Sequence, residues 1–253
     1  MKLELEGRVA LVTGASRGIG LAIAQAFAVE GAQVALVARG RDSLEQARAA
    51  IDGQTSCHLA DVTDPNAAIA LVREVEKQHG RIDILICNVG SGASVPPGQE
   101  TPAEWRRVLD LNLFATTNMI EAAWPVMRRG TSDRAIVCIS SICGLAALGA
   151  PVTYSAAKAA LNATVRGLAR PLAADGIRIN AVAPGNILFE GGTWSRKLAE
   201  NRAGVEDMLE REVALRRLGT PAEIADIVSF LASPRATFIT GTVVVADGGQ
   251  LRA

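Results

Sequence analysis

The chain lacks most features that would indicate a metal-binding, extracellular or nucleic-acid-binding protein. Its 253 residues include four cysteines without a C-x-x-C pair, two histidines in no repeated ligand pattern, and a single tyrosine. We therefore expect no metal site, and cysteines that are reduced and mostly buried. Lysine plus arginine equals aspartate plus glutamate at 26 each, so no net charge favours binding to nucleic acid or to an anionic membrane surface.

Long apolar runs are also missing. No stretch approaches the roughly 18 apolar residues of a membrane-spanning helix, and residues 1–6 alternate charged and apolar side chains without an apolar leader segment. We predict a cytoplasmic protein without a membrane partner. The length suits one α/β domain over residues 1–253.

Short β-branched runs alternate with longer segments of helical period, which is typical of a parallel sheet covered by helices on both faces. We predict a three-layer, doubly wound α/β fold with a seven-stranded parallel sheet. The expected strands are residues 8–13, 33–38, 54–59, 82–87, 134–140, 177–183 and 242–246. The expected helices are residues 17–30, 41–51, 65–79, 101–129, 151–174, 195–214 and 221–232. The glycine-rich stretch after the sixth strand predicts a mobile flap at about residues 184–214.

A glycine-rich turn follows the first strand and leads directly into a helix. It runs from Thr13 to Gly20, with the spacing G-x-x-x-G-x-G. Glycines allow a tight turn and the close approach of a pyrophosphate, and the helix N-terminus supplies unpaired N–H groups. The turn therefore predicts a dinucleotide site, although a tight strand-to-helix turn without a ligand remains an alternative.

The end of the second strand bears on the type of dinucleotide. A fold that selects NAD places an acid at this point for the ribose 2′-hydroxyl, whereas this chain has Ala38 and Arg39. Arg39, together with Arg17 from the glycine turn, could bind a 2′-phosphate, so we expect NADP(H) to be favoured over NAD(H). Two solvated surface arginines are the alternative.

The only tyrosine, Tyr154, stands four residues before Lys158, and Ser141 lies thirteen residues upstream of it. Residues four apart on a helix share one face. An ammonium at this place would lower the pKa of the phenol toward a range useful for acid–base work. A half-buried tyrosine beside a solvated lysine would give the same spacing.

The glycine turn, Asn88, Ser141, Tyr154 and Lys158 follow one another along the chain in a specific order and spacing. On the basis of these residues, the chain resembles the short-chain dehydrogenase/reductase family from about residue 7 to 249. Within it, the chain is similar to the short single-domain carbonyl reductases of the 3-oxoacyl-ACP reductase kind. The resemblance implies a Rossmann-type fold. It also implies that Tyr154 is the acid/base and that Ser141 binds the substrate oxygen. Lys158 would hold the nicotinamide ribose, and Asn112 would hold a relay water.

The resemblance also implies a set of cofactor-binding residues: Gly14, Ser16, Arg17, Gly18, Ile19, Gly20, Arg39, Asp61, Val62, Asn88, Gly90, Tyr154, Lys158, Pro184, Gly185 and Ile187. Two positions depart from the family pattern. Cys87 and Val89 flank Asn88 where the family often has asparagine and alanine, and Phe189 stands where a threonine commonly binds the carboxamide.

The segment from Ile142 to Thr153 carries no charge and should border the substrate. Together with Leu145, Phe189 and Trp194 as candidate pocket residues, it suggests an apolar, uncharged carbonyl compound or alcohol. Phe189 and Trp194 could equally pack the flap against the core.

These features predict an NADP(H)-dependent oxidoreductase that interconverts a ketone and a secondary alcohol, with 3-oxoacyl thioesters within its range. The alternatives are an enzyme of the sugar-nucleotide epimerase or dehydratase kind, and a dinucleotide-binding sensor or scaffold without catalysis. The long apolar helices at 101–129 and 151–174 predict a homotetramer or a homodimer.

Overall fold

The computed structural model describes residues 2–252 of the chain. All seven expected strands are present and form one parallel sheet in the order β3-β2-β1-β4-β5-β6-β7, which confirms the doubly wound fold. The strands are β1 (Val9–Thr13), β2 (Gln33–Ala38), β3 (Thr55–Leu59), β4 (Ile84–Cys87), β5 (Arg134–Ile139), β6 (Ile177–Pro184) and β7 (Val243–Ala246).

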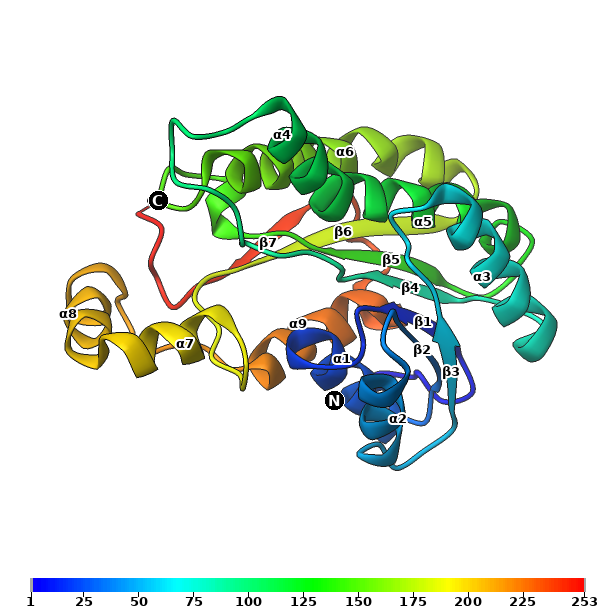
Figure 1. Cartoon of the computed structure of the whole chain (residues 1–253). Helices are drawn as coiled ribbons and strands as arrows, with labels where there is room; N and C mark the ends of the chain where they lie inside the picture. Colours follow the sequence, from blue (N-terminus) through cyan, green and yellow to red (C-terminus); the bar gives the residue numbers. More distant parts are fainter. Residues whose placement is uncertain (1, 253) are drawn as a thin grey trace.

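Helices cover both faces of the sheet (Figure 1). One face carries α3 (Pro65–His79), α4 (Pro102–Leu109), α5 (Ala115–Met127) and α6 (Val152–Ala174), and the other carries α1 (Gly18–Val29), α2 (Arg41–Ala49) and α9 (Pro221–Ala232). Successive residues of a strand point to opposite faces, so Leu11 packs into the α3, α5 and α6 core while Val12 packs into the α1 and α9 core. Both faces of the sheet are therefore buried beneath helices, as the apolar strand sequences require.

The helix starts follow the local capping signals. Asp64 and Thr101 accept hydrogen bonds from the second or third backbone N–H of α3 and α4. Thr220 forms a reciprocal capping box with Glu223 at the start of α9. Each of these helices has proline at its first position, where the missing N–H costs nothing.

The long helix expected at residues 101–129 is wrong in detail, because a π-helical turn at Asp110–Phe114 separates α4 from α5. The side-chain amide of buried Asn112 donates to the Val108 carbonyl at 3.1 Å. This carbonyl is the one that an α-helix pairs with the backbone N–H of residue 112. The side chain thus replaces a regular helical hydrogen bond, which hydrophobic periodicity does not reveal.

The helix expected at 195–214 is also wrong, because it is two helices, α7 (Thr193–Glu200) and α8 (Arg202–Glu212). Asn201 lies between them in a non-helical conformation with φ of −153° and ψ of 78°, and its side chain accepts a hydrogen bond from Gly204 N at 2.9 Å. An asparagine that caps a new helix ends the preceding one.

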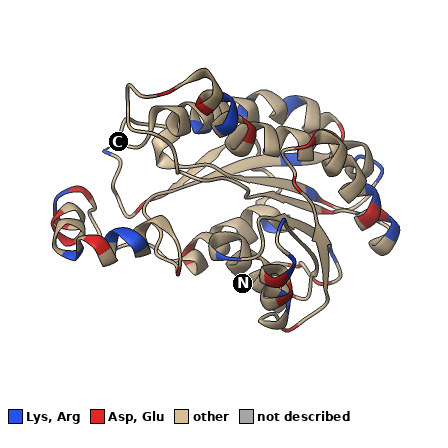
Figure 2. Cartoon of the chain, viewed as in Figure 1, with Lys and Arg blue, Asp and Glu red and all other residues tan. Residues whose placement is uncertain are grey.

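Charged residues lie mainly on the helices and connections, while the central strands are mostly free of them (Figure 2). Among residues 2–252, no helix combines the length and the apolar character that crossing a membrane would need. Across the same residues, no group of three or more histidine, cysteine or acidic side chains is arranged to hold a metal ion.

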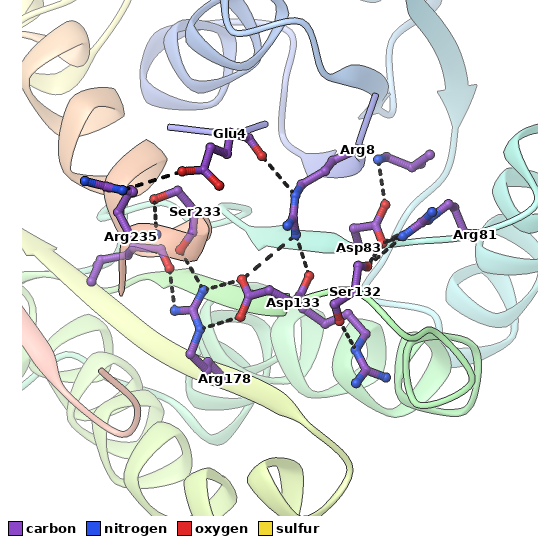
Figure 3. A network of polar contacts seen from close by, with 12 residues as sticks. Glu4, Arg8, Arg81, Asp83, Ser132, Asp133, Arg178, Ser233 and Arg235 are labelled. Atoms are coloured by element: carbon purple, nitrogen blue, oxygen red, sulfur yellow. Dashed lines mark hydrogen bonds and ion pairs between the residues drawn. The ribbon is translucent and has the colours of Figure 1, made fainter. Parts of the chain in front are cut away.

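The amino-terminal edge of the sheet is held by a buried ionic network (Figure 3). Arg178 binds both carboxylate oxygens of Asp133, at 3.1 and 2.9 Å, and also donates to the carbonyls of Leu231 and Ser233 at the end of α9. Asp83 accepts hydrogen bonds from Arg81, from Ser132 and from Val9 N. The network joins the starts of β1, β4, β5 and β6. A ligand site is therefore expected at the other end of the strands, where their carboxyl ends lie.

Candidate active site

The opposite, carboxyl edge of the sheet borders a cavity of about 1020 Å³. Its lining includes residues that follow β1, β2, β3, β4, β5 and β6, so the loops of most strands meet there. Open parallel sheets bind their ligands at this edge. The cavity contains most of the expected site residues, with the exceptions of Gly18, Gly20, Asn112 and Leu145.

The glycine turn after β1 is built for close contact. A Cβ on Gly20 would stand 2.2 Å from the Gly14 carbonyl oxygen, so no other residue fits there without moving the backbone. Asn88 Nδ2 donates to the carbonyls of Thr13 and Gly14, both at 3.1 Å. Asn88 therefore holds the turn in shape, in addition to lining the cavity.

The start of α1 faces the cavity with unpaired donors. Arg17, its N-cap residue, is extended and makes no side-chain cap, so the first backbone N–H groups of the helix have no partner from it. Ser16, Arg17 and Ile19 line the cavity beside them. This arrangement suits a phosphate or pyrophosphate.

Arg39 and Asp61 line the end of the cavity that follows β2 and β3. Their side chains form an exposed ion pair, with Arg39 Nη1 3.5 Å from Asp61 Oδ2. Burial alone would raise the pKa of Asp61, but hydrogen bonds from Thr63 and the nearby Arg39 lower it overall. Arg17 instead reaches toward the flap, where its Nη1 lies 3.8 Å from the place of a Cβ on Gly191.

Ser141, Tyr154 and Lys158 meet in the same cavity. Ser141 follows β5 and caps a short 3₁₀ turn at Ile142–Gly144, where its Oγ accepts from Cys143 N at 3.2 Å. This turn lies directly on α6, because a Cβ on Gly144 would stand 2.6 Å from the carbonyl carbon of Lys158. Glycine at this point allows the serine to approach the tyrosine and the lysine.

Lys158 is buried, and its Nζ donates to the Ile139 carbonyl at 2.8 Å. Burial lowers the pKa of Lys158 to about 8, although the Cys138 and Cys87 thiols act to raise it. An ammonium has three N–H groups, so two remain for other partners. A Cβ on Gly90 would lie 3.2 Å from Nζ, so glycine leaves room beside the amine.

The expected lowering of the tyrosine pKa is wrong. Burial raises the pKa of Tyr154 to about 12, a hydrogen bond with Ser141 acts in the opposite direction, and Cys143 adds to the rise. Lys158 Nζ lies 5.9 Å from the centroid of the phenol ring and does not offset the burial. The phenol is therefore neutral at physiological pH.

Asn112 does not line the cavity. Its Oδ1 accepts from Ser91 N at 2.9 Å, and its Nδ2 donates to the Ser91 and Val108 carbonyls, both at 3.1 Å. Both side-chain N–H groups are thus used by the backbone. The side chain positions the loop after β4 and has no N–H left for the expected relay water.

Phe189 and Trp194 line the cavity and also pack the flap. The Phe189 ring lies on two glycines, because Cβ atoms on Gly18 and Gly192 would each stand 2.9 Å from it. It therefore closes the flap onto the glycine turn. Trp194 packs on a small cluster around α8, with Lys197 Nζ 4.5 Å from its ring centroid. Leu145, the third candidate, is 39% exposed and lies outside the lining.

The cavity also includes residues that the sequence did not single out, among them Asn186, Met208, Glu212 and Gln250. Gln250 could have been found, because it closely follows the seventh expected strand and so reaches the carboxyl edge. Met208 and Glu212 carried no such signal. Both lie in α8, and no local pattern in the sequence indicates that this helix borders the cavity.

Replacing Lys158 by methionine tests the buried amine. Since the pKa of Lys158 falls from 10.5 to about 8 on folding, the variant should be more stable at pH 7 by up to about 3 kcal/mol. The unfolded chain binds this proton more tightly, so wild-type stability should rise from pH 8 to 10.5. Urea unfolding of both proteins across this range checks the prediction, and parallel curves would contradict it.

Gly144→Ala should lower the free energy of unfolding by about 2 kcal/mol or more, because the new Cβ meets the α6 backbone. Gly167→Ala is the matched control. Gly167 belongs to α6, the helix that Gly144 contacts, and a Cβ added to Gly167 would meet nothing within 4 Å. That change should raise stability by up to about 1 kcal/mol. Equal effects in denaturant unfolding would argue against the close approach.

Comparison with known proteins identifies the family. A protein-family profile described as enoyl-(acyl carrier protein) reductase matches residues 14–250. Acetoacetyl-CoA reductase of Shinella zoogloeoides is 39% identical over 243 residues, which cover 96% of this chain and 98% of that protein.

Solved structures show the same fold at full length. L-sorbose reductase of Gluconobacter frateurii, in complex with NADPH and L-sorbose, matches with a TM-score of 0.92 and 32% identity over 100% of both chains. A 7α-hydroxysteroid dehydrogenase in complex with NADH and 7-oxo glycochenodeoxycholic acid matches with a TM-score of 0.91 and 30% identity, covering 100% of this chain and 97% of that one. With Ser141, Tyr154 and Lys158 at the cavity, these matches make the chain an NAD(P)-dependent oxidoreductase that belongs to the short-chain dehydrogenase/reductase family.

Proposed function

We propose that this protein interconverts a ketone and a secondary alcohol, with NADP(H) as the hydride carrier. One observation carries the proposal: Ser141, Tyr154 and Lys158 lie in the same cavity as the uncapped N-terminus of α1 and the side chain of Arg39. A proton donor, a buried amine and a phosphate-binding turn thus share one space.

The chain's own residues would handle the proton. A bound nicotinamide dinucleotide supplies or accepts the hydride. In the reducing direction, the neutral phenol of Tyr154 donates its proton to the oxygen on which negative charge develops, since an alkoxide is a stronger base than a phenolate. Ser141 donates a hydrogen bond to the same oxygen. The remaining N–H groups of Lys158 hold a cofactor hydroxyl, and its charge stabilises the phenolate that forms.

NADP(H) is favoured over NAD(H) by the residues that follow β2. Arg39 is the basic group at this strand end, and its partner Asp61 belongs to the next strand end. An exposed arginine paired with an exposed carboxylate can exchange that partner for a 2′-phosphate at little cost. One solved relative is in complex with NADPH and another with NADH, so the family alone does not fix the cofactor and the proposal rests on Arg39.

The related proteins named above are a reductase of acetoacetyl-CoA, a reductase of the sugar L-sorbose and a dehydrogenase of a hydroxysteroid, which supports the reaction type across a range of substrates. A 3-oxoacyl thioester remains within the proposed range. The epimerase or dehydratase alternative is not favoured, because these full-length relatives are reductases and dehydrogenases. A non-catalytic sensor is not favoured either, because Ser141, Tyr154 and Lys158 all line the cavity. The homotetramer or homodimer and the cytoplasmic location stay predictions.

Tyr154→Phe should reduce turnover of ketones by at least about a hundredfold, since the variant lacks the proton donor. Binding of NADPH, measured by fluorescence titration, should change little, because the ring remains. Turnover close to that of the wild type in an NADPH absorbance assay would remove Tyr154 from the mechanism.

Arg39→Leu should weaken NADPH binding by about tenfold to a hundredfold while leaving NADH binding nearly unchanged, because only the 2′-phosphate loses a charged partner. Arg41→Leu is the matched control, since Arg41 is an equally exposed arginine that pairs with Glu45 and lies outside the cavity lining. Titration of both variants with both cofactors checks this. An unchanged NADPH/NADH ratio in Arg39→Leu would contradict the assignment.

A further inference from the structure

Gln250 stands at the end of the cavity that lies beyond the reacting groups. Along the carboxyl edge, Arg39 and Asp61 follow β2 and β3, Ser141 follows β5, and Gln250 follows β7. The sheet order places β7 at the opposite border from β3. A dinucleotide that extends from Arg39 past Ser141 would use the strand ends up to β6, which leaves Gln250, after β7, to the substrate.

The side chain of Gln250 has an unmet hydrogen-bonding need. Among the described residues, its Oε1 is buried and has no hydrogen-bond partner. Buried polar atoms without a partner are uncommon in proteins and cost stability. Since Gln250 lines the cavity and the terminal torsion of a glutamine is broad, rotation of the amide would bring this oxygen to a molecule bound there.

The backbone around Gln250 is firmly held, so the side chain is well placed. Asp247 accepts hydrogen bonds from Gly249 N at 2.9 Å and from Leu251 N at 2.7 Å. The same segment packs on the end of α8, where a Cβ on Gly249 would stand 2.8 Å from Ala214 Cβ. The unmet need is thus not the result of a loose chain end.

Neighbouring groups of the lining add further polar capacity. Asn186 follows β6, and its Nδ2 contacts only the Met208 sulfur, at 3.9 Å, which is a weak acceptor. Glu212 lines the cavity and forms no ion pair within 4 Å in the part of the chain that the structure describes. This wall of the cavity therefore offers hydrogen bonds to a bound molecule, in addition to the apolar surface of Phe189 and Trp194.

We infer that Gln250 recognises a hydroxyl or amide N–H group of the substrate, on the side of the reacting carbonyl that faces away from the dinucleotide. The inference rests on the proposed ketone reduction and names its substrate class, a ketone with a neutral hydrogen-bond donor at a distance from the carbonyl. A substrate that lacks this donor leaves the Gln250 amide unpaired on binding, which disfavours it.

The first experiment compares matched ketones. The kcat/KM of the wild type is measured with NADPH for a series of 2-alkanones and for the ω-hydroxy-2-alkanones of the same chain length. At the preferred length the hydroxylated member should be favoured, and Gln250→Leu should lower this preference by about tenfold to a hundredfold. The preference should persist in Gln54→Leu, a change at an exposed glutamine before β3. A wild type without preference, or a preference unchanged in Gln250→Leu, would overturn the inference.

A second experiment does not depend on catalysis. Gln250→Met removes the unpaired amide and should raise the thermal midpoint of the ligand-free protein by about 3 °C, whereas Gln54→Met should leave it nearly unchanged. A lower or unchanged midpoint for Gln250→Met overturns the inference whatever the ketones show. If the wild type reduces no ketone but Gln250→Met still raises the thermal midpoint, the result would contradict the proposed reaction and not the role of Gln250.

Discussion

The burial of one amine organises the site. Lys158 lies inside the protein, where the charged form is disfavoured, and burial lowers its pKa to about 8. The Ile139 carbonyl supplies one partner at 2.8 Å. Gly144 lets the turn after Ser141 lie on the helix that carries the lysine, and Gly90 leaves space beside Nζ. The cost of an under-satisfied buried cation is the kind of strain that active sites retain for binding and catalysis.

The two ends of the strands have different roles: the amino-terminal end carries paired polar groups that stabilise the fold, and the carboxyl end carries the site. At the amino-terminal edge, Arg178 and Asp133 satisfy each other and tie β5 and β6 to the end of α9. At the carboxyl edge, α1 has no side-chain cap, and Gln250 Oε1 has no hydrogen-bond partner among the described residues. Unsatisfied polar groups are tolerated there because ligands can complete them, while the paired edge holds the strands in register.

Phe189, which departs from the pattern expected in the sequence analysis, has a clear packing role in the structure. The phenylalanine ring packs between Gly18 of the glycine turn and Gly192 of the flap, and both glycines leave just enough room for it. The start of the segment after β6 thus packs by apolar contact on the turn that would hold the cofactor phosphates, and Trp194 extends the contact onto α8.

The sequence alone determined three features, because each depends on a local pattern. The hydrophobic periodicity predicts the strands of the sheet, the glycine spacing predicts the turn after β1, and the separation by four residues places Tyr154 and Lys158 one helical turn apart. Most of the site residues that the sequence predicted line the cavity, since loops after parallel strands meet at one edge. Only the tertiary structure decided the pKa of Tyr154, because burial outweighs the hydrogen bond with Ser141. The π turn at Asn112 and the unpaired amide of Gln250 were likewise decided by packing between segments far apart in the chain, which no local pattern records.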